Sequence, residues 1–177
     1  MSSFQELVSY RRSKRLDLQC KDRVKDLIVA DDLKLLEIKY FNGMGRGVVA
    51  KTQIKHQQLV AAYTGDYITE KEGVQRESEY AKTDRNNPNL MSYIFYFKYN
   101  GKKLCVDATN ESPRLGRLIN HSKKMENIKP KAMLTKDLEG PYLIFVALRD
   151  IEPGTQLLYD YNETRKEVIA ANPYLAE

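Results

Sequence analysis

The sequence contains no tryptophan, two cysteines and two histidines among its 177 residues. Two cysteines, Cys20 and Cys105, cannot build a zinc site by themselves, and they exclude a fold that depends on several disulfides. We therefore expect no bound metal, and we take a reducing intracellular compartment as the default environment.

Long apolar runs are absent as well. No stretch approaches the ~20 apolar residues of a membrane span, and residues 1–13 lack the apolar centre of a signal peptide. Hydrophobic residues make up 42% of the chain and charged residues 30%, which is typical of a globular protein. The sequence therefore predicts one domain with its own core and no contact with a membrane.

Positive charge gathers near the N-terminus, although the formal net charge is only +5. The basic residues of this segment are Arg11, Arg12, Lys14, Arg15, Lys21, Arg23 and Lys25. Apolar residues between positions 16 and 28 add a partial helical stripe. A solvated helix face fits this pattern, and so does a nuclear-import patch or a contact with DNA or a nucleosome. The sequence leaves these alternatives open.

Most of the remaining chain consists of short segments with strand-like patterns. The expected strands cover residues 33–41, 48–50, 59–64, 92–99, 102–108, 131–135, 142–148 and 156–161. Turns are predicted at Gly65-Asp66, Asn100-Gly101 and Glu139-Gly140, with a type II turn at Pro153-Gly154 and a polar loop at 84–89. The predicted fold class is mainly β with short helices (α+β) and mostly antiparallel pairing.

Two capping boxes predict the main helices. Thr69 followed by Glu72 predicts a helix that runs to about residue 82. Thr164 followed by Glu167 predicts a short C-terminal helix that ends near Pro173.

Two short motifs carry candidate binding residues. The segment Gly43-Met-Gly-Arg-Gly47 permits positive φ angles and a close approach of the backbone to a ligand. It is not a dinucleotide-binding fingerprint, because Val48 stands where the last glycine is required. The segment Arg114-Leu-Gly-Arg-Leu-Ile-Asn-His-Ser122 offers hydrogen-bond donors, acceptors and an imidazole. Each motif by itself also fits a structural turn.

A pair of tyrosines near the C-terminus forms the third candidate. Tyr159 and Tyr161 flank Asp160, so in a strand both side chains project to the same face. Their hydroxyls could line a narrow channel for a long alkyl-ammonium side chain, or both rings could simply pack on the core. The spacing alone does not decide between the two.

Taken in order, these three motifs, the last of them Leu157-Leu-Tyr-Asp-Tyr161, resemble the signature motifs of SET-domain protein lysine methyltransferases. The resemblance extends from about residue 17 to the C-terminus. Residues 63–66, 93–99, 105–109 and 172–175 further resemble the branch of histone H4 lysine-20 monomethyltransferases (the PR-Set7/SET8 type). The resemblance implies a SET domain at 33–162 with small antiparallel sheets and a pseudoknot, an N-terminal basic and helical flank at 1–32, and a C-terminal flanking helix at 163–177.

The same resemblance implies an S-adenosylmethionine-dependent histone lysine N-methyltransferase that produces S-adenosylhomocysteine and needs no metal. It implies monomethylation of lysine 20 on the histone H4 tail in nucleosomes, by a monomer located in the nucleus on the chromosome. The implied cofactor-binding residues are Met44, Gly45, Arg46, Tyr93, Asn120, His121 and Tyr174.

The resemblance also assigns the catalytic and substrate-binding roles. It makes Tyr161 the catalytic tyrosine, together with Tyr159 and Tyr63, and a tyrosine at position 159 goes with transfer of a single methyl group. The implied substrate-binding residues are Tyr63, Tyr93, Tyr159 and Glu163.

Three departures from the pattern leave the peptide preference open. Met44 stands where the related enzymes have lysine, Tyr174 replaces a tryptophan, and Asn162-Glu163 replaces a Gly-Asp pair. The alternatives are a different histone or non-histone substrate, a non-catalytic chromatin-binding SET-like module, and a basic β-rich nucleic-acid-binding module. In the last case the sheet aromatics at 93 and 95–97 would stack bases, but they alternate between two faces.

Overall fold

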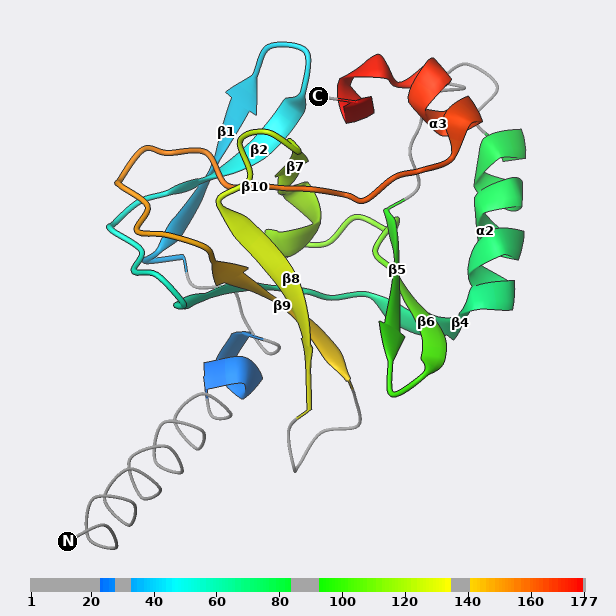
Figure 1. Cartoon of the computed structure of the whole chain (residues 1–177), viewed down its shortest axis with the longest axis horizontal. Helices are drawn as coiled ribbons and strands as arrows, with labels where there is room; N and C mark the ends of the chain where they lie inside the picture. The colour runs from blue at the N-terminus through cyan, green and yellow to red at the C-terminus, as the bar shows by residue number, and fades with distance from the viewer. Residues whose placement is uncertain (1–22, 28–32, 84–92, 135–140, 177) are drawn as a thin grey trace, which may run out of the picture.

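The computed structural model describes residues 23–27, 33–83, 93–134 and 141–176 (Figure 1). Residues 23–27 are helical. The remaining elements, in chain order, are β1 (Leu36–Phe41), β2 (Gly45–Ala50), β3 (Leu59–Tyr63), β4 (Asp66–Thr69), α2 (Glu70–Thr83), β5 (Ile94–Tyr99), β6 (Lys102–Asp107), η1 (Gly116–Leu118), β7 (Asn120–His121), β8 (Ile128–Met133), β9 (Tyr142–Ala147), β10 (Leu158–Tyr159), α3 (Lys166–Ala171) and η2 (Pro173–Ala176).

The described strands form four small sheets. Their orders are β1-β2, β3-β9-β8, β4-β6-β5 and β7-β10. All pairings are antiparallel except that of β7 with β10, which is parallel. The prediction of a mainly β chain with short helices and mostly antiparallel pairing is therefore confirmed.

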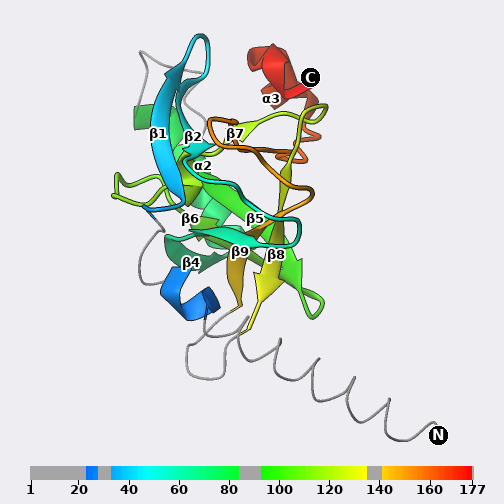
Figure 2. The ribbon, with the colours of Figure 1, turned by 90° about the vertical axis from the view of Figure 1, so that its left-hand side faces the viewer.

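The β3-β9-β8 sheet lies at the centre of the core because β3 and β9 are covered on both faces. Their sequences are almost continuously apolar, as expected for strands without a solvent-exposed side. On one face, Phe145 packs in the main core. On the other face, Ile144 packs with Val24 and Leu27 from the N-terminal helical segment, which Figure 2 shows beside this part of the molecule.

The β5–β6 hairpin and α2 form one side of the molecule. Asn100 and Gly101 have φ angles of 47° and 77°, which the tight type I′ connection requires, so the predicted hairpin is confirmed. The predicted capping box is also confirmed, because Glu72 accepts a hydrogen bond from the Thr69 amide and its own amide donates to the Thr69 hydroxyl. A Cβ at Gly73 would lie 2.7 Å from Cys105 Sγ, so glycine permits the close contact of α2 with β6.

Turn predictions were only partly right. The type II turn at Pro153-Gly154 is confirmed by the φ of 82° at Gly154 and by the hydrogen bond from the Thr155 amide to the Glu152 carbonyl. The predicted turn at Gly65-Asp66 is wrong in part, because Asp66 already begins β4 and pairs with Asp107. The chain turns at Gly65 alone, where a Cβ would lie 2.2 Å from the Asp107 carbonyl oxygen.

Two predictions near the C-terminus need correction. The strand expected at 156–161 is reduced to Leu158–Tyr159, because it pairs in parallel with the two residues of β7. The capping box of Thr164 with Glu167 does not form, and α3 begins at Lys166 without a side-chain cap. Glu163 instead accepts hydrogen bonds from the amides of Thr164 and Arg165.

Several predictions fall outside the described residues. These are the basic positions 11–21, the polar loop at 84–89 and the turn at 139–140. The domain boundaries at 32/33 and 162/163, and the pseudoknot, remain predictions. No described helix is both long enough and apolar enough to cross a membrane.

Candidate active site

The three motifs of the sequence, which lie far apart along the chain, meet in the structure. Asn120 pairs with Leu158 and His121 with Tyr159 across the parallel β7–β10 ladder. The Asn120 side-chain amide donates to the Arg46 carbonyl oxygen at 3.2 Å, which joins the glycine-rich segment to the same site. A Cβ at Gly47 would lie 2.7 Å from Asn120 Nδ2, so glycine is required for this contact.

An aromatic cluster surrounds Tyr159. The centroid of its ring lies 4.7 Å from that of Tyr161, 4.8 Å from Phe145 and 5.9 Å from Phe95, with which it is stacked. Tyr63 meets Phe95 edge to face at 5.3 Å. The tyrosines predicted to be catalytic are therefore brought into one cluster, in which Phe95 is partly buried against the core.

Two hydroxyl groups of this cluster donate hydrogen bonds to the backbone. Tyr161 donates to the Ile119 carbonyl at 2.9 Å, and Tyr63 donates to the Tyr93 carbonyl at 2.8 Å. Burial raises the pKa values of Tyr63, Tyr159 and Tyr161 above the ordinary tyrosine value. All three are therefore neutral phenols at physiological pH, and each donating hydroxyl retains lone pairs that can accept a further contact.

A groove with a volume of about 730 Å³ opens next to these tyrosines. Its walls come from α2, β5 and the segment that leads from β10 into α3, which Figure 1 shows converging at one side of the molecule. Tyr63, Tyr159, Tyr161 and Glu163 all line it. The predicted catalytic tyrosines and one predicted substrate-binding carboxylate thus share a cavity.

The wall of the groove contains an ion cluster that sequence reasoning missed. Arg165 donates to both carboxylate oxygens of Glu163, with a shortest distance of 2.7 Å, and to Glu77 on α2 at 3.0 Å. Burial tends to raise the pKa of Glu163, but the hydrogen bonds from Arg165 outweigh it and hold the pKa below its ordinary value. Glu163 is therefore charged, and in this structure its partner is an arginine of its own chain.

The residues predicted to bind the cofactor do not line this groove. Met44 is exposed, and Gly43 and Gly45 have φ angles of 77° and 70° with nothing within 4 Å of a Cβ built on either. Tyr174 is 42% exposed on η2. The structure thus separates the predicted site residues into a groove set and a set outside it.

The sequence analysis also missed two residues that contact the predicted cofactor-binding residues. Glu111 accepts two hydrogen bonds from the guanidinium of Arg46, which raise the Arg46 pKa. The Arg117 guanidinium lies 4.0 Å over the ring of Tyr93 and donates to the Ala108 carbonyl at 2.7 Å. The signal for Arg117 was an arginine flanked by apolar residues at 115, 116, 118 and 119, which predicts a buried charge that needs carbonyl partners.

His121 is buried and holds the backbone next to the tyrosine pair. Its Nδ1 accepts a hydrogen bond from the Tyr161 amide at 3.0 Å. Burial lowers the pKa of His121, and Asp160, at 3.9 Å, only partly opposes this effect. The ring is therefore neutral with its proton on Nε2. His121 Nε2 and Arg117 Nη1 are both buried, and Arg117 Nη1 lies 3.3 Å from the Glu111 carboxylate.

Comparison with known proteins identifies the family. The family model of the SET domain matches residues 45–162, which is more than half of the chain. The chain belongs to the SET domain family.

Its relatives point to one branch of that family. This SET domain is 41% identical over 141 residues to the histone-lysine N-methyltransferase Set8 of Drosophila melanogaster, covering 80% of this chain and 19% of that protein. It is 38% identical over 174 residues to the N-lysine methyltransferase KMT5A of Xenopus tropicalis, covering 94% and 48%. The crystal structure of CpSET8 from Cryptosporidium is 38% identical with a TM-score of 0.64, covering 73% of this chain and 58% of that one.

The chain spans between about a fifth and half of the two curated relatives, so their activities are considered below as proposals. Within the described residues, this SET domain has no group of three or more side chains arranged to hold a metal ion.

Proposed function

We propose that this chain is a lysine N-methyltransferase that transfers one methyl group from S-adenosylmethionine to the ε-amine of lysine 20 on histone H4 in nucleosomes. The observation that carries the proposal is the cluster of neutral tyrosines, Tyr63, Tyr159 and Tyr161, at one groove. The names of the SET8 and KMT5A relatives support the reaction class.

The groove suits a lysine side chain that must lose its proton. A free lysine has a pKa of about 10.4, so its deprotonation at pH 7 costs about 4–5 kcal/mol. Burial among the neutral tyrosine rings would remove water from the amine, and this desolvation disfavours the ammonium and favours the free amine. Tyr161 and Tyr63 keep their rings fixed through their hydrogen bonds to backbone carbonyls. The chain's main contribution is then alignment of the amine, which accounts for much of the rate of such displacements.

The residues outside the groove fit S-adenosylmethionine, which supplies an electrophilic methyl group when bound. Arg117 Nη1 is a buried cationic donor whose anionic partner in this structure is the Glu111 carboxylate, 3.3 Å away. Such a donor fits an anionic group. His121 Nε2 offers a second buried donor, and the open backbone at Gly43 and Gly45 leaves room for a ligand. We propose that Met44, Gly45, Arg46, Tyr93, Asn120, His121 and Tyr174 hold the cofactor.

The separation of these residues from the groove supports entry of cofactor and substrate from opposite sides. Glu163, a charged carboxylate at the groove, is paired with Arg165 in this structure, and a basic group of the peptide beside the target lysine would take the place of Arg165. Histone tails are rich in such groups, which supports the H4 tail and the nucleosome as partners, and the nucleus and chromosome as the location.

The proposal is tested by incubating the chain with isotopically labelled S-adenosylmethionine and recombinant nucleosomes, followed by mass spectrometry of each histone. We expect a single methyl group on lysine 20 of H4. A methyl group on a different lysine would move the assignment to another substrate. Absence of transfer by a chain that binds nucleosomes would favour the non-catalytic chromatin-binding alternative.

A further inference from the structure

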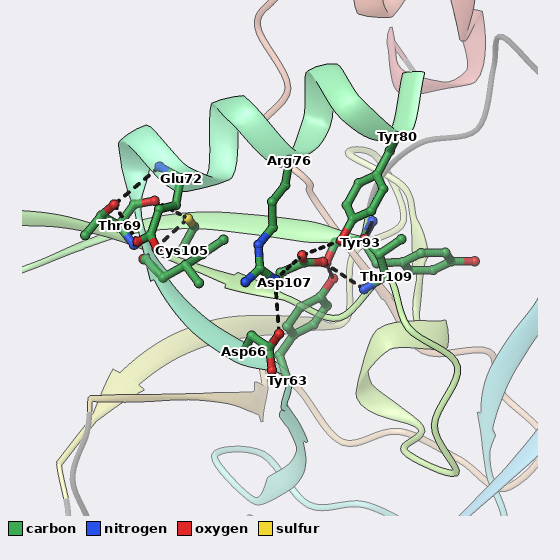
Figure 3. Close-up of polar contacts among 11 residues, drawn as sticks. Tyr63, Asp66, Thr69, Glu72, Arg76, Tyr80, Tyr93, Cys105, Asp107 and Thr109 are labelled. Carbon is green, nitrogen blue, oxygen red and sulfur yellow. Dashed lines mark hydrogen bonds and ion pairs between the residues drawn. The ribbon is translucent and has the colours of Figure 1, made fainter. Parts of the chain in front are cut away.

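A buried carboxylate lies next to the tyrosine groove but has no part in the proposed reaction. Asp107 is the last residue of β6, and its side chain is 2% exposed. A buried charge is costly unless it is paired and hydrogen-bonded. Figure 3 shows that this carboxylate contacts side chains of α2 and the segment that follows β6.

Two of these partners come from α2. Arg76 Nη1 and the Tyr80 hydroxyl each donate to Asp107 Oδ2 at 2.8 Å. Arg76 Nη1 also lies 3.0 Å from Asp66 Oδ2 on β4. Burial tends to raise the pKa of Asp107, but these donors outweigh it and the pKa lies below its ordinary value. Asp107 is therefore an anion that ties α2 to the sheet beneath it.

The other carboxylate oxygen leads toward the groove. Asp107 Oδ1 accepts from the Thr109 amide at 3.0 Å, and the Thr109 hydroxyl in turn accepts from the Tyr93 amide at 3.2 Å. The Tyr93 carbonyl accepts from the Ala108 amide at 2.9 Å and from the Tyr63 hydroxyl at 2.8 Å. Both backbone groups of Tyr93 are thus fixed by the segment that Asp107 orients.

We propose that Asp107 and Thr109 are positioning residues. Through the backbone of Tyr93, they set the orientation of the Tyr63 ring at the groove. This inference rests on the proposed methyltransferase function. Neither residue touches the substrate.

The hydrogen bonds that lead from Asp107 to Tyr63 favour this role over simple stabilisation of the fold. Hydrogen bonds to a charged acceptor are shorter and about twice as strong as neutral ones, so the Thr109 backbone has one preferred place. An aligned displacement loses rate steeply when a wall residue moves, and a misplacement of about 1 Å can cost 100-fold. Small shifts at Asp107 should therefore appear in the rate of methyl transfer rather than in substrate binding.

The sharpest test uses two substitutions at one position. Thr109→Val keeps the shape of the side chain but removes the oxygen that accepts from Tyr93, whereas Thr109→Ser keeps that oxygen. We expect the valine variant to lower kcat about tenfold with the KM for S-adenosylmethionine changed by less than about twofold. The serine variant should retain a kcat close to that of the original chain.

Asp107→Asn tests the anion itself and should lower kcat at least as much as Thr109→Val. Lys103→Gln serves as the matched control, because it breaks an exposed ion pair with Glu70 at 2.8 Å between the same two elements, β6 and α2. This control should leave kcat unchanged. If Asp107→Asn does not fold, the pair of Thr109 variants carries the test alone.

A second measurement does not depend on activity. The spectrum of ring-¹³C-labelled tyrosine should show a shifted Tyr63 signal, identified by its loss in Tyr63→Phe, in Thr109→Val but not in Thr109→Ser. Equal kcat values for the two Thr109 variants, or an unshifted Tyr63 signal in Thr109→Val, would overturn the inference while leaving the enzyme assignment intact. An original chain that methylates no lysine would overturn the proposed function, and the positioning role with it.

Discussion

The hydroxyl of Tyr161 donates a 2.9 Å hydrogen bond to the backbone carbonyl of Ile119, the residue directly before the Asn120-His121 pair. The Tyr161 amide meanwhile donates to the ring of His121. The proposed catalytic tyrosine is therefore fixed at both its backbone and its hydroxyl by the segment that we propose binds the cofactor. The two halves of the site share one scaffold.

Removal of the Tyr161 hydroxyl should nearly abolish methyl transfer. In Tyr161→Phe the ring loses its anchor on Ile119, and the oxygen that could accept C–H···O contacts from a polarised methyl group is gone. We expect kcat to fall by about 100-fold or more. The measurement is transfer of labelled methyl to nucleosomes at saturating cofactor.

Stability provides the control for this variant. Loss of one buried hydrogen bond should cost about 1–3 kcal/mol, because the Ile119 carbonyl is left without its partner. Thermal unfolding should therefore remain cooperative. Turnover by Tyr161→Phe close to that of the original chain would contradict the assignment of Tyr161 as catalytic.

His121 should be required for cofactor binding. In His121→Ala the Tyr161 amide loses its acceptor, and the buried Nε2 donor disappears. We expect the affinity for S-adenosylmethionine to fall by about tenfold or more, equivalent to about 1.4 kcal/mol. Titration calorimetry on a variant shown to be folded by circular dichroism measures this directly, and unchanged affinity would remove His121 from the cofactor site.

The parts of this fold that the sequence predicted are those set by local interactions. Asn100-Gly101 determines a two-residue turn wherever it occurs between strands, and the Thr69–Glu72 capping box closes within four residues. The Thr164 box failed for an equally local reason, because Glu163 already accepts from the amides at 164 and 165.

What the sequence could not predict depends on contacts between distant segments. The parallel β7–β10 ladder pairs residues 38 positions apart, and its two-residue length gives no periodic pattern to detect. Within the site, the spacing of Tyr159 and Tyr161 was enough to place both on one face. The partners of Asp107 on α2 lie 27 and 31 residues away, so no local motif revealed them.

The stability of the protein should fall as the pH drops below about 6.5. The pKa of His121 is lowered in the folded state, so the unfolded chain binds a proton first as the pH decreases. Folding then loses up to about 1.4 kcal/mol per pH unit between 6.5 and the lowered pKa of His121. Urea unfolding at several pH values should show this slope in the original chain.

His121→Asn lacks the titrating group and serves as the comparison for the pH experiment. Its unfolding free energy should be lower at pH 7 but should depend less on pH between 7 and 5.5. Equal slopes for the two proteins would show that other groups control this range.

Tyr159 should limit the enzyme to one methyl group. Its ring is buried between Phe95, Phe145 and Tyr161, so the aromatic wall is held in place when only the hydroxyl is removed. For a second transfer, a monomethylated amine must rotate its lone pair and bring its existing methyl group into space next to that hydroxyl. Tyr159→Phe frees a volume of roughly one methyl group there, and each ~1.4 kcal/mol removed from the second barrier raises that rate tenfold.

We therefore expect the original chain to stop at monomethyl lysine and Tyr159→Phe to accumulate dimethyl lysine. Mass spectrometry of one peptide over time measures both products. Dimethyl product from the original chain, or an unchanged product ratio in the variant, would show that the Tyr159 hydroxyl does not control this step.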